Sequence, residues 1–360
     1  MVFVTDRTFS KTARDIMTKS EVAVSTKTIF AGKLRRYHTV KWYRQLLDLP
    51  TTLQNVRDVL LVGVGLVQSW WMLGREKPDA VFTKGGFVCL PIGLAAHIRR
   101  IPLVIHDSDS HPGLTNRLLS RYATVIATGA PLENYPYDPA KSHYVGIPVS
   151  TAFRPVGAKE RQDAKDALGF PDTTWPVVVV TGGGLGAARI NTAMLLIADQ
   201  LIDRGIGVYH IAGTGQVRAV AQKAPKHPAY IVRAFDQHMD KVFAAADVVV
   251  SRAGATALAE ISAASRPLII VPSRLLSAGH QLKNAAVYEK QGAAVVLDEQ
   301  QIEHAPADLL QSITHLIDHP AEAMAMAERL HKLAKPQAAA AMAALIAKAY
   351  AYSREVGEGE

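Results

Sequence analysis

The sequence predicts an α/β protein of two Rossmann-like domains that face each other across a cleft. Its 360 residues suit two domains better than one core. Short β-branched runs alternate with helical patterns along the chain, which indicates βαβ units and parallel sheets. Most runs are apolar throughout, as in strands covered on both faces. The expected strands are residues 2–4, 21–25, 79–82, 103–106, 124–127 and 143–145, then 177–180, 207–211, 230–233, 247–250, 268–271 and 293–297.

A proline-bearing segment in the middle of the chain divides the two predicted domains. Residues 1–150 form the first domain, 151–175 the linker and 176–334 the second domain. Residues 335–360 are rich in alanine and are expected to form a helix that packs back on the first domain. In doubly wound sheets ligands bind outside the carboxyl ends of the strands, so the loops there are the candidate sites.

Composition favours a cytoplasmic protein. Cys89 is the one cysteine in the sequence, so a disulfide framework is excluded and a reducing compartment is expected. The N-terminal residues lack the basic-then-apolar order of a signal peptide. The longest apolar run, Val59–Val67 with its continuation to Leu73, is predicted to be too short and too interrupted to span a bilayer.

The formal net charge of +8 suits polyanionic partners. One basic stretch precedes the apolar run and contains aromatic residues but no acidic ones. It resembles an interfacial anchor for anionic lipid, and a solvated basic face is the equally weighted alternative. Nucleic acid is not an expected partner, because no binding motif accompanies the charge. The stretch comprises Lys33, Arg35, Arg36, Tyr37, Lys41, Trp42, Tyr43 and Arg44.

A glycine loop at residues 182–186 follows an expected strand and precedes an apolar helical pattern. Such a loop lets the backbone approach a phosphate at a helix N-terminus, and a purely structural tight turn is the alternative. A NAD site would need an acidic residue at the end of the next strand, which instead reads His210 to Gly213 without a carboxylate. A NAD-dependent oxidoreductase is therefore disfavoured, and no cofactor is expected.

A second strand, glycine turn and helix run from Asp247 through Gly254 and carry Arg252 and Glu260. The Glu260 carboxylate can accept hydrogen bonds from two ribose hydroxyls. Further on, Gln281 and Asn284 are amides suited to sugar hydroxyls. A surface helix charge and a loop amide are the bland alternatives for Glu260 and Gln281.

Five motifs, in order, resemble glycosyltransferase family 28, whose bacterial members convert lipid I to lipid II: FTKGGFVCLP, IPLVIHDSDSHPGLTNRLLS, TGGGLGAARIN, SRAGATALAE and GHQLKNA. The resemblance covers nearly the whole chain. It implies the GT-B architecture, UDP-N-acetylglucosamine as donor, a lipid-pyrophosphate acceptor and inverting transfer on the cytoplasmic face of the membrane. It implies donor contacts from Gly183, Gly184, Leu185, Gly186, Arg252, Thr256, Glu260 and Gln281, and acceptor contacts from Lys84, Gly85, Gly86, Asp107 and Asn116.

The sequence departs from the family pattern at several positions. The family's first strand and histidine-bearing glycine loop have no match, so both are expected to be lacking. Asp107 and Asp109 replace a glutamate and an asparagine, Gly184 replaces a serine, and Ser150 replaces an arginine. Asp109 is accordingly the hypothetical catalytic base, with a turn-capping aspartate as the alternative. No Asp-x-Asp signature is placed on the donor side, so no metal is expected.

Other functions stay open beside transfer to lipid I in peptidoglycan synthesis. A UDP-N-acetylglucosamine 2-epimerase shares the architecture, and its acid/base groups would come from the segment that holds His106, Asp107, Asp109 and His111. A related transferase with another lipid acceptor is a second alternative. A third is a donor-binding subunit whose missing loop is supplied by a partner chain.

Overall fold

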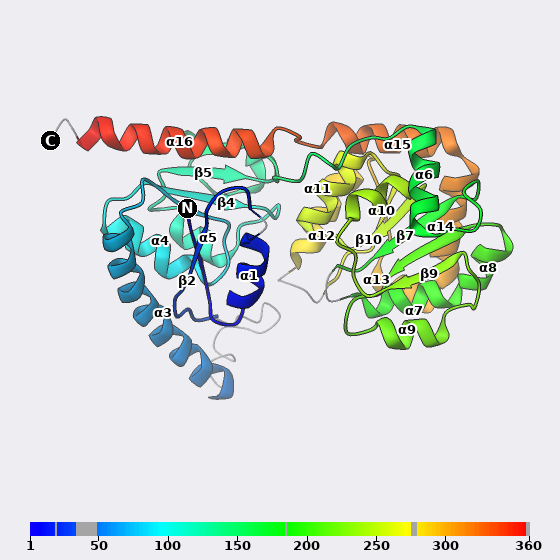
Figure 1. Cartoon of the computed structure of the whole chain (residues 1–360), viewed down its shortest axis with the longest axis horizontal. Coiled ribbons are helices and arrows are strands. Elements are labelled where there is room, and N and C mark those ends of the chain that lie inside the picture. Colours follow the sequence, from blue (N-terminus) through cyan, green and yellow to red (C-terminus); the bar gives the residue numbers. More distant parts are fainter. Residues whose placement is uncertain (19, 34–48, 184–185, 275–278, 358–360) are drawn as a thin grey trace. The chain divides into compact units, whose positions relative to one another are not determined.

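The computed structural model describes residues 1–18, 20–33, 49–183, 186–274 and 279–357 (Figure 1). The chain forms two compact units: Met1–Val145 together with Ala340–Glu360, and Gly146–Ala339. The first boundary lies five residues before the predicted domain end at residue 150. The basic stretch from Arg35 to Arg44 lies outside the described residues.

The second unit contains a six-stranded sheet in which all neighbouring strands pair in parallel. The central strand, β7, is buried along its whole length. Alternate β7 residues serve the two faces, since Val178 and Val180 enter one core and Val177 and Val179 the other. In sheet order the strands are β12 (Val295–Val296), β11 (Leu268–Ile270), β10 (Val248–Ser251), β7 (Val177–Thr181), β8 (Gly207–Ile211) and β9 (Tyr230–Arg233).

Helices cover both faces of this sheet (Figure 1). They are α6 (Ala158–Leu168), α7 (Ala188–Leu196), α8 (Ala198–Asp203), α9 (Val217–Lys223), α10 (Met239–Ala245), α11 (Ala255–Ala264), α12 (His280–Lys290), α13 (Glu299–His304), α14 (Pro306–Asp318) and α15 (Pro320–Lys332).

The strand order of the second unit creates a switch point beside β7. The chain runs from β7 through β8 to β9 on one side and then returns with β10 to the other side. The loops after β7 and β10 therefore leave the sheet in opposite directions. A crevice outside the carboxyl ends of two such strands is the usual ligand site of an open parallel sheet.

The first unit has a four-stranded parallel sheet in the order β3 (Val81–Thr83), β4 (Leu103–Asp107), β5 (Val125–Thr128) and β6 (Ser142–Tyr144). Helix α16 (Ala338–Gly357) packs on this sheet, with Met342 and Ala349 buried against β4, β5 and the residue after β6. The other helices are α1 (Ser10–Met17), α3 (Leu49–Glu76), α4 (Cys89–Ile98), α5 (Leu114–Leu119) and the short 3-10 turns Leu132–Asn134 and Pro139–Lys141.

Two further strands of the first unit, β1 (Val2–Thr5) and β2 (Ser25–Thr28), form a separate parallel pair. The predicted strand at 21–25 is wrong by about four residues, because the register with β1 selects Ser25–Thr28 and leaves Val22 59% exposed. In the second unit β7 lies between β8 and β10 and pairs with both. Among the described strands of the first unit, none lies between β1 and β3 to unite the two sheets.

Helix α3 runs without a break for 28 residues and contains the whole apolar run from Val59 to Leu73. Within the described part of the chain, Thr51–Glu76 is long and apolar enough to cross a membrane by length and composition, with a mean hydropathy of 1.3. Only 22% of its most apolar window is buried.

Candidate functional site

The glycine turn after β7 brings the chain tightly into helix α7. Gly183 and Gly186 have φ angles of +78° and +79°, a region that favours glycine. A Cβ on Gly186 would lie 2.2 Å from the Ala212 carbonyl oxygen, so only glycine fits against the loop after β8. The N-cap residue, Ala187, makes no side-chain hydrogen bond to the helix. The turn therefore presents a helix N-terminus at the switch point, a suitable place for a phosphate. Two predicted members, Gly184 and Leu185, lie outside the described residues.

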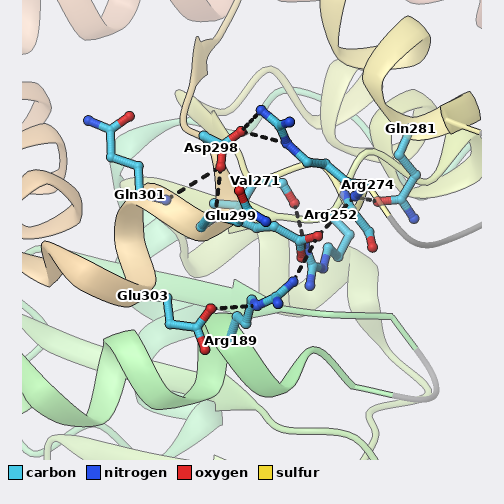
Figure 2. A network of polar contacts seen from close by, with 11 residues as sticks. Arg189, Arg252, Val271, Arg274, Gln281, Asp298, Glu299, Gln301 and Glu303 are labelled. Carbon is cyan, nitrogen blue, oxygen red and sulfur yellow. Dashed lines mark hydrogen bonds and ion pairs between the residues drawn. The ribbon is translucent and has the colours of Figure 1, made fainter.

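Arg252, directly after β10, is held by a buried glutamate (Figure 2). Its Nη1 lies 2.8 Å from Oε2 of Glu299 and donates to the Val271 carbonyl oxygen at 3.0 Å. Glu299 opens α13 and is only 1% exposed. Its Oε1 lies 3.2 Å from Nη1 of Arg189 on α7. One carboxylate thus joins the loops that follow β7, β10 and β12.

The loop after β11 joins the same network (Figure 2). The Arg274 backbone N–H donates to Oε1 of Glu299 at 2.9 Å, and the Ser273 N–H donates to Oε1 of Gln281 at 2.9 Å. Gln281 therefore lies beside this network, and its carbonyl oxygen already accepts a backbone hydrogen bond. Asn284 is buried and donates to the Ala253 carbonyl oxygen at 3.0 Å, which ties that amide to the loop after β10.

Glu260 and Thr256 lie on helix α11, which begins after Gly254. Thr256 is exposed and Glu260 is half-buried. Burial raises the pKa of Glu260 to about 6. A carboxyl with a raised pKa, near a switch point, is typical of a functional position.

The predicted acceptor loop follows β3 in the first unit. Gly85 and Gly86 have φ angles of +79° and +86°, and Lys84 is exposed. Asn116 packs directly against Gly85, where a Cβ would meet its Nδ2 at 3.2 Å. The same Nδ2 donates to the His106 carbonyl oxygen at 2.9 Å. The structure therefore brings the glycine loop together with Asn116 of the second motif.

The two candidate carboxylates of this unit differ in surroundings. Asp107 ends β4, is 6% exposed and accepts a hydrogen bond from the Tyr137 hydroxyl. Burial raises the pKa of Asp107, against the hydrogen bonds from Tyr137, Asn116 and Gly113 that favour its ionised form. Asp109 is only half-buried, and its backbone carbonyl oxygen accepts a hydrogen bond from the Tyr135 hydroxyl at 2.6 Å.

Sequence reasoning missed Glu299, Arg274 and Arg189. A usable signal was present for Glu299, since it follows the expected strand at 293–297 and carries the Asp298 N-cap. Which arginines it binds depends on the sheet order, which the sequence does not display.

Comparisons with known proteins agree on one family. The glycosyltransferase family 28 C-terminal domain matches residues 177–342, and the glycosyltransferase family 28 N-terminal domain matches residues 13–128. A relative from Symbiobacterium thermophilum is 36% identical over 314 residues, which cover 85% of this chain and 81% of the relative. That relative is named UDP-N-acetylglucosamine–N-acetylmuramyl-(pentapeptide) pyrophosphoryl-undecaprenol N-acetylglucosamine transferase.

Solved structures share the fold. MurG of Acinetobacter baumannii aligns with a TM-score of 0.67 and 21% identity, covering 97% of this chain and 99% of that one. A UDP-GlcNAc 2-epimerase from Neisseria meningitidis, solved with UDP-GlcNAc bound, aligns with a TM-score of 0.60 and 15% identity, covering 96% and 98%. The predicted GT-B fold class is confirmed by these neighbours, which at such identities speak to fold alone.

Proposed function

The chain belongs to glycosyltransferase family 28, and on that premise we propose that it transfers N-acetylglucosamine from UDP-N-acetylglucosamine to undecaprenyl-pyrophosphoryl-N-acetylmuramyl-pentapeptide. This reaction converts lipid I to lipid II in peptidoglycan synthesis. The observation that carries the proposal on the donor side is the convergence of the glycine turn, Arg252 and Gln281 on one network at the switch point.

The proposed reaction is an inverting displacement at the anomeric carbon of N-acetylglucosamine. The acceptor hydroxyl oxygen forms the new bond to that carbon while the bond to the UDP oxygen breaks. The electron pair leaves with UDP, and the hydroxyl proton passes to a base. Charge on the departing diphosphate is stabilised by the backbone N–H groups at the start of α7.

Each donor-side residue has a proposed role. Gly183–Gly186 hold the diphosphate, Arg252 and Thr256 line the nucleotide pocket, Glu260 accepts the ribose hydroxyls and Gln281 binds the sugar. The raised pKa of Glu260, about 6, still leaves most of it ionised at neutral pH. An ionised carboxylate accepts from both hydroxyls at once, which supports this role.

Asp109 is the proposed base, and Lys84, Gly85, Gly86, Asp107 and Asn116 are the proposed acceptor contacts. A base must come within hydrogen-bond reach of the attacking hydroxyl. Half-buried Asp109 meets that condition better than Asp107, whose carboxylate is almost fully buried and bound by Tyr137.

We also propose that the first unit docks on an anionic membrane surface through α3. The solvent face of this helix carries Leu53, Val56, Leu60, Val64, Val67 and Trp71, exposed by 48–68%. Their spacing of three or four residues places them on one stripe. The opposite face, by contrast, buries the polar Thr51, Asp58 and Ser69.

Docking in the plane of the membrane fits α3 better than spanning. Its inner face packs against the first-unit core through Leu73, with Leu66 and Met72 beside it. The Phe30 backbone N–H also donates to Oε1 of Gln68 at 2.8 Å. A spanning helix would have to lose these contacts. An amphipathic helix that keeps its apolar face outward lies in the interface.

The proposed function is tested by measuring UDP release with and without a lipid-pyrophosphate acceptor. Acceptor-dependent release together with a disaccharide product supports transfer to lipid I. Release with only a different lipid acceptor indicates a related transferase. Acceptor-free epimerisation of the donor indicates the 2-epimerase alternative. UDP binding without turnover, restored by a partner protein, indicates the donor-binding subunit.

A further inference from the structure

We propose that Glu299 is a positioning residue for donor binding, which holds Arg252 and Arg189 at the crevice where the nucleotide diphosphate enters. The inference rests on the proposed function, because it concerns the same donor site. Glu299 itself need not touch the donor; it acts through the two arginines.

The contacts of Glu299 use both carboxylate oxygens (Figure 2). Oε2 faces Arg252 at 2.8 Å, and Oε1 faces Arg189 at 3.2 Å. Oε1 also accepts the Arg274 backbone N–H at 2.9 Å. The carboxylate is therefore bound from three directions by groups that come from three other strand-to-helix connections.

This arrangement fixes the edge of the sheet on which the donor is proposed to bind. Arg189 lies in the first turn of α7, directly after the glycine turn. Arg252 follows β10, Arg274 follows β11 and Glu299 follows β12. The strands β7, β10, β11 and β12 are parallel, so their carboxyl ends lie at one edge of the sheet. The carboxylate of Glu299 connects the loops at that edge through its hydrogen bonds and ion pairs.

The negative charge of Glu299 is essential to this link. Burial alone would raise its pKa, but the hydrogen bonds from Arg274 and Arg252 and the charges of Arg252 and Arg189 outweigh burial and hold the pKa below its usual value. Without that charge, Arg252 would lose the carboxylate of Glu299, and Arg189 would keep only the exposed Glu303. Removing one partner of a buried ion pair leaves the other uncompensated, and the loops are then expected to separate.

A neighbouring carboxylate offers a matched control. Glu303 also binds Arg189, with Oε2 lying 2.7 Å from Nε, but its side chain is 43% exposed. Within the part of the chain that the structure describes, it forms no ion pair with Arg252. An exposed pair of this kind contributes little. Glu303→Gln therefore removes one carboxylate partner of Arg189 and leaves the contacts of Glu299 with Arg189 and Arg252 in place.

The experiment compares Glu299→Gln, Glu299→Asp, Glu303→Gln, Arg252→Ala and the double variant Arg252→Ala/Glu299→Gln with the wild-type chain. In Glu299→Gln an amide nitrogen replaces one carboxylate oxygen. It meets a donor whichever way the amide turns, Arg252 on one side or Arg189 and the Arg274 N–H on the other. The readouts are the Kd for UDP, the KM for UDP-N-acetylglucosamine, the KM for the lipid acceptor, and kcat. Melting temperatures identify variants that fold poorly, for which Glu299→Asp, with its charge kept and its reach shortened, is the second measure.

The expected result is a rise of about tenfold or more in Kd for UDP and KM for the donor in Glu299→Gln, the factor that corresponds to ~1.4 kcal/mol. The acceptor KM should not change, Glu303→Gln should bind UDP as the wild type does, and Glu299→Asp should fall between. The double variant should lose less UDP affinity than the sum of the two single losses, because Glu299 acts in part through Arg252.

Additive losses of UDP affinity in the double variant, or equal losses in Glu299→Gln and Glu303→Gln, would overturn the inference. If the wild-type chain binds UDP and turns over, the proposed function stands in either case. A wild-type chain that fails to bind UDP would instead overturn the proposed function.

Discussion

The Nε2 atom of His210 lies 2.9 Å from Oδ1 of Asn191, deep inside the second unit. Asn191 donates through Nδ2 to the Ala212 carbonyl oxygen at 3.0 Å and to Oε1 of Gln216 at 2.8 Å, so its Oδ1 is the acceptor and His210 carries its proton on Nε2. The other ring nitrogen, Nδ1, then accepts from the Tyr230 hydroxyl at 2.9 Å. The neutral His210 on β8 thus binds α7 through Asn191 and β9 through Tyr230. Asn191 in turn binds the loop that touches the glycine turn.

This buried histidine predicts an acid-sensitive unit. Burial lowers the pKa of His210 to about 4. The unfolded chain, with an ordinary pKa near 6.5, binds the proton first, so stability is present above pH 6.5 and is lost as pH falls towards 4. His210→Gln should lessen that loss, which is at most ~1.4 kcal/mol per pH unit. Urea unfolding between pH 7 and 4.5 measures it. Exposed His238, changed to glutamine, is the control and should leave the slope unaltered.

Glu260 predicts a pH-dependent donor affinity. Because its pKa is about 6, the carboxylate takes up a proton as pH falls through that value and loses its ability to accept from two ribose hydroxyls. The KM for UDP-N-acetylglucosamine should rise below pH 6 in the wild type. Glu260→Gln should show a KM raised about tenfold and flat across this range, the loss expected for a charged hydrogen bond. A wild-type slope that persists in Glu260→Gln assigns it to another group.

Asp109 predicts a split between turnover and donor binding. Asp109→Asn should lower kcat by about 10²–10⁴, the usual contribution of a general base, and leave the Kd for UDP unchanged. Rapid-quench measurement of a single turnover isolates the chemical step. Asp107→Asn, in contrast, turns one of the two oxygens that accept from Tyr137 and Gly113 into a donor, and is expected to lower the melting temperature. If Asp109→Asn turns over at the wild-type rate, Asp109 is not the base.

The exposed stripe of α3 predicts membrane binding that one charge disrupts. Leu60 is 66% exposed at the middle of the stripe. Leu60→Glu should weaken partition onto anionic phospholipid vesicles about tenfold, since it removes apolar contact and adds a repelled charge. Co-sedimentation at fixed ionic strength measures the effect. Gln54→Glu introduces the same side chain at an exposed polar position on the helix and is the matched control. Equal losses in both variants would show a purely electrostatic effect and count against docking by the stripe.

Most strands and the glycine turn after β7 could be predicted from the sequence. The run Val177–Val180 is apolar at every position, as in a strand covered on both faces. Gly182–Gly186 follow it directly, so local sequence order alone places a glycine turn at a helix start. The position of β2 could not be predicted in this way, because its residues are polar and its bounds are set by pairing with β1.

What the sequence by itself determined, then, is the succession of strands, turns and helices, because short-range pattern governs these. The tertiary structure decided which loops meet. Glu299 is an unremarkable helix-start residue until sheet order places β12, β11, β10 and β7 side by side and brings Arg252 and Arg189 to its carboxylate. It also decided that the apolar stripe of α3 faces outward, since packing against the first-unit core chooses one face of the helix and leaves the other to the surroundings.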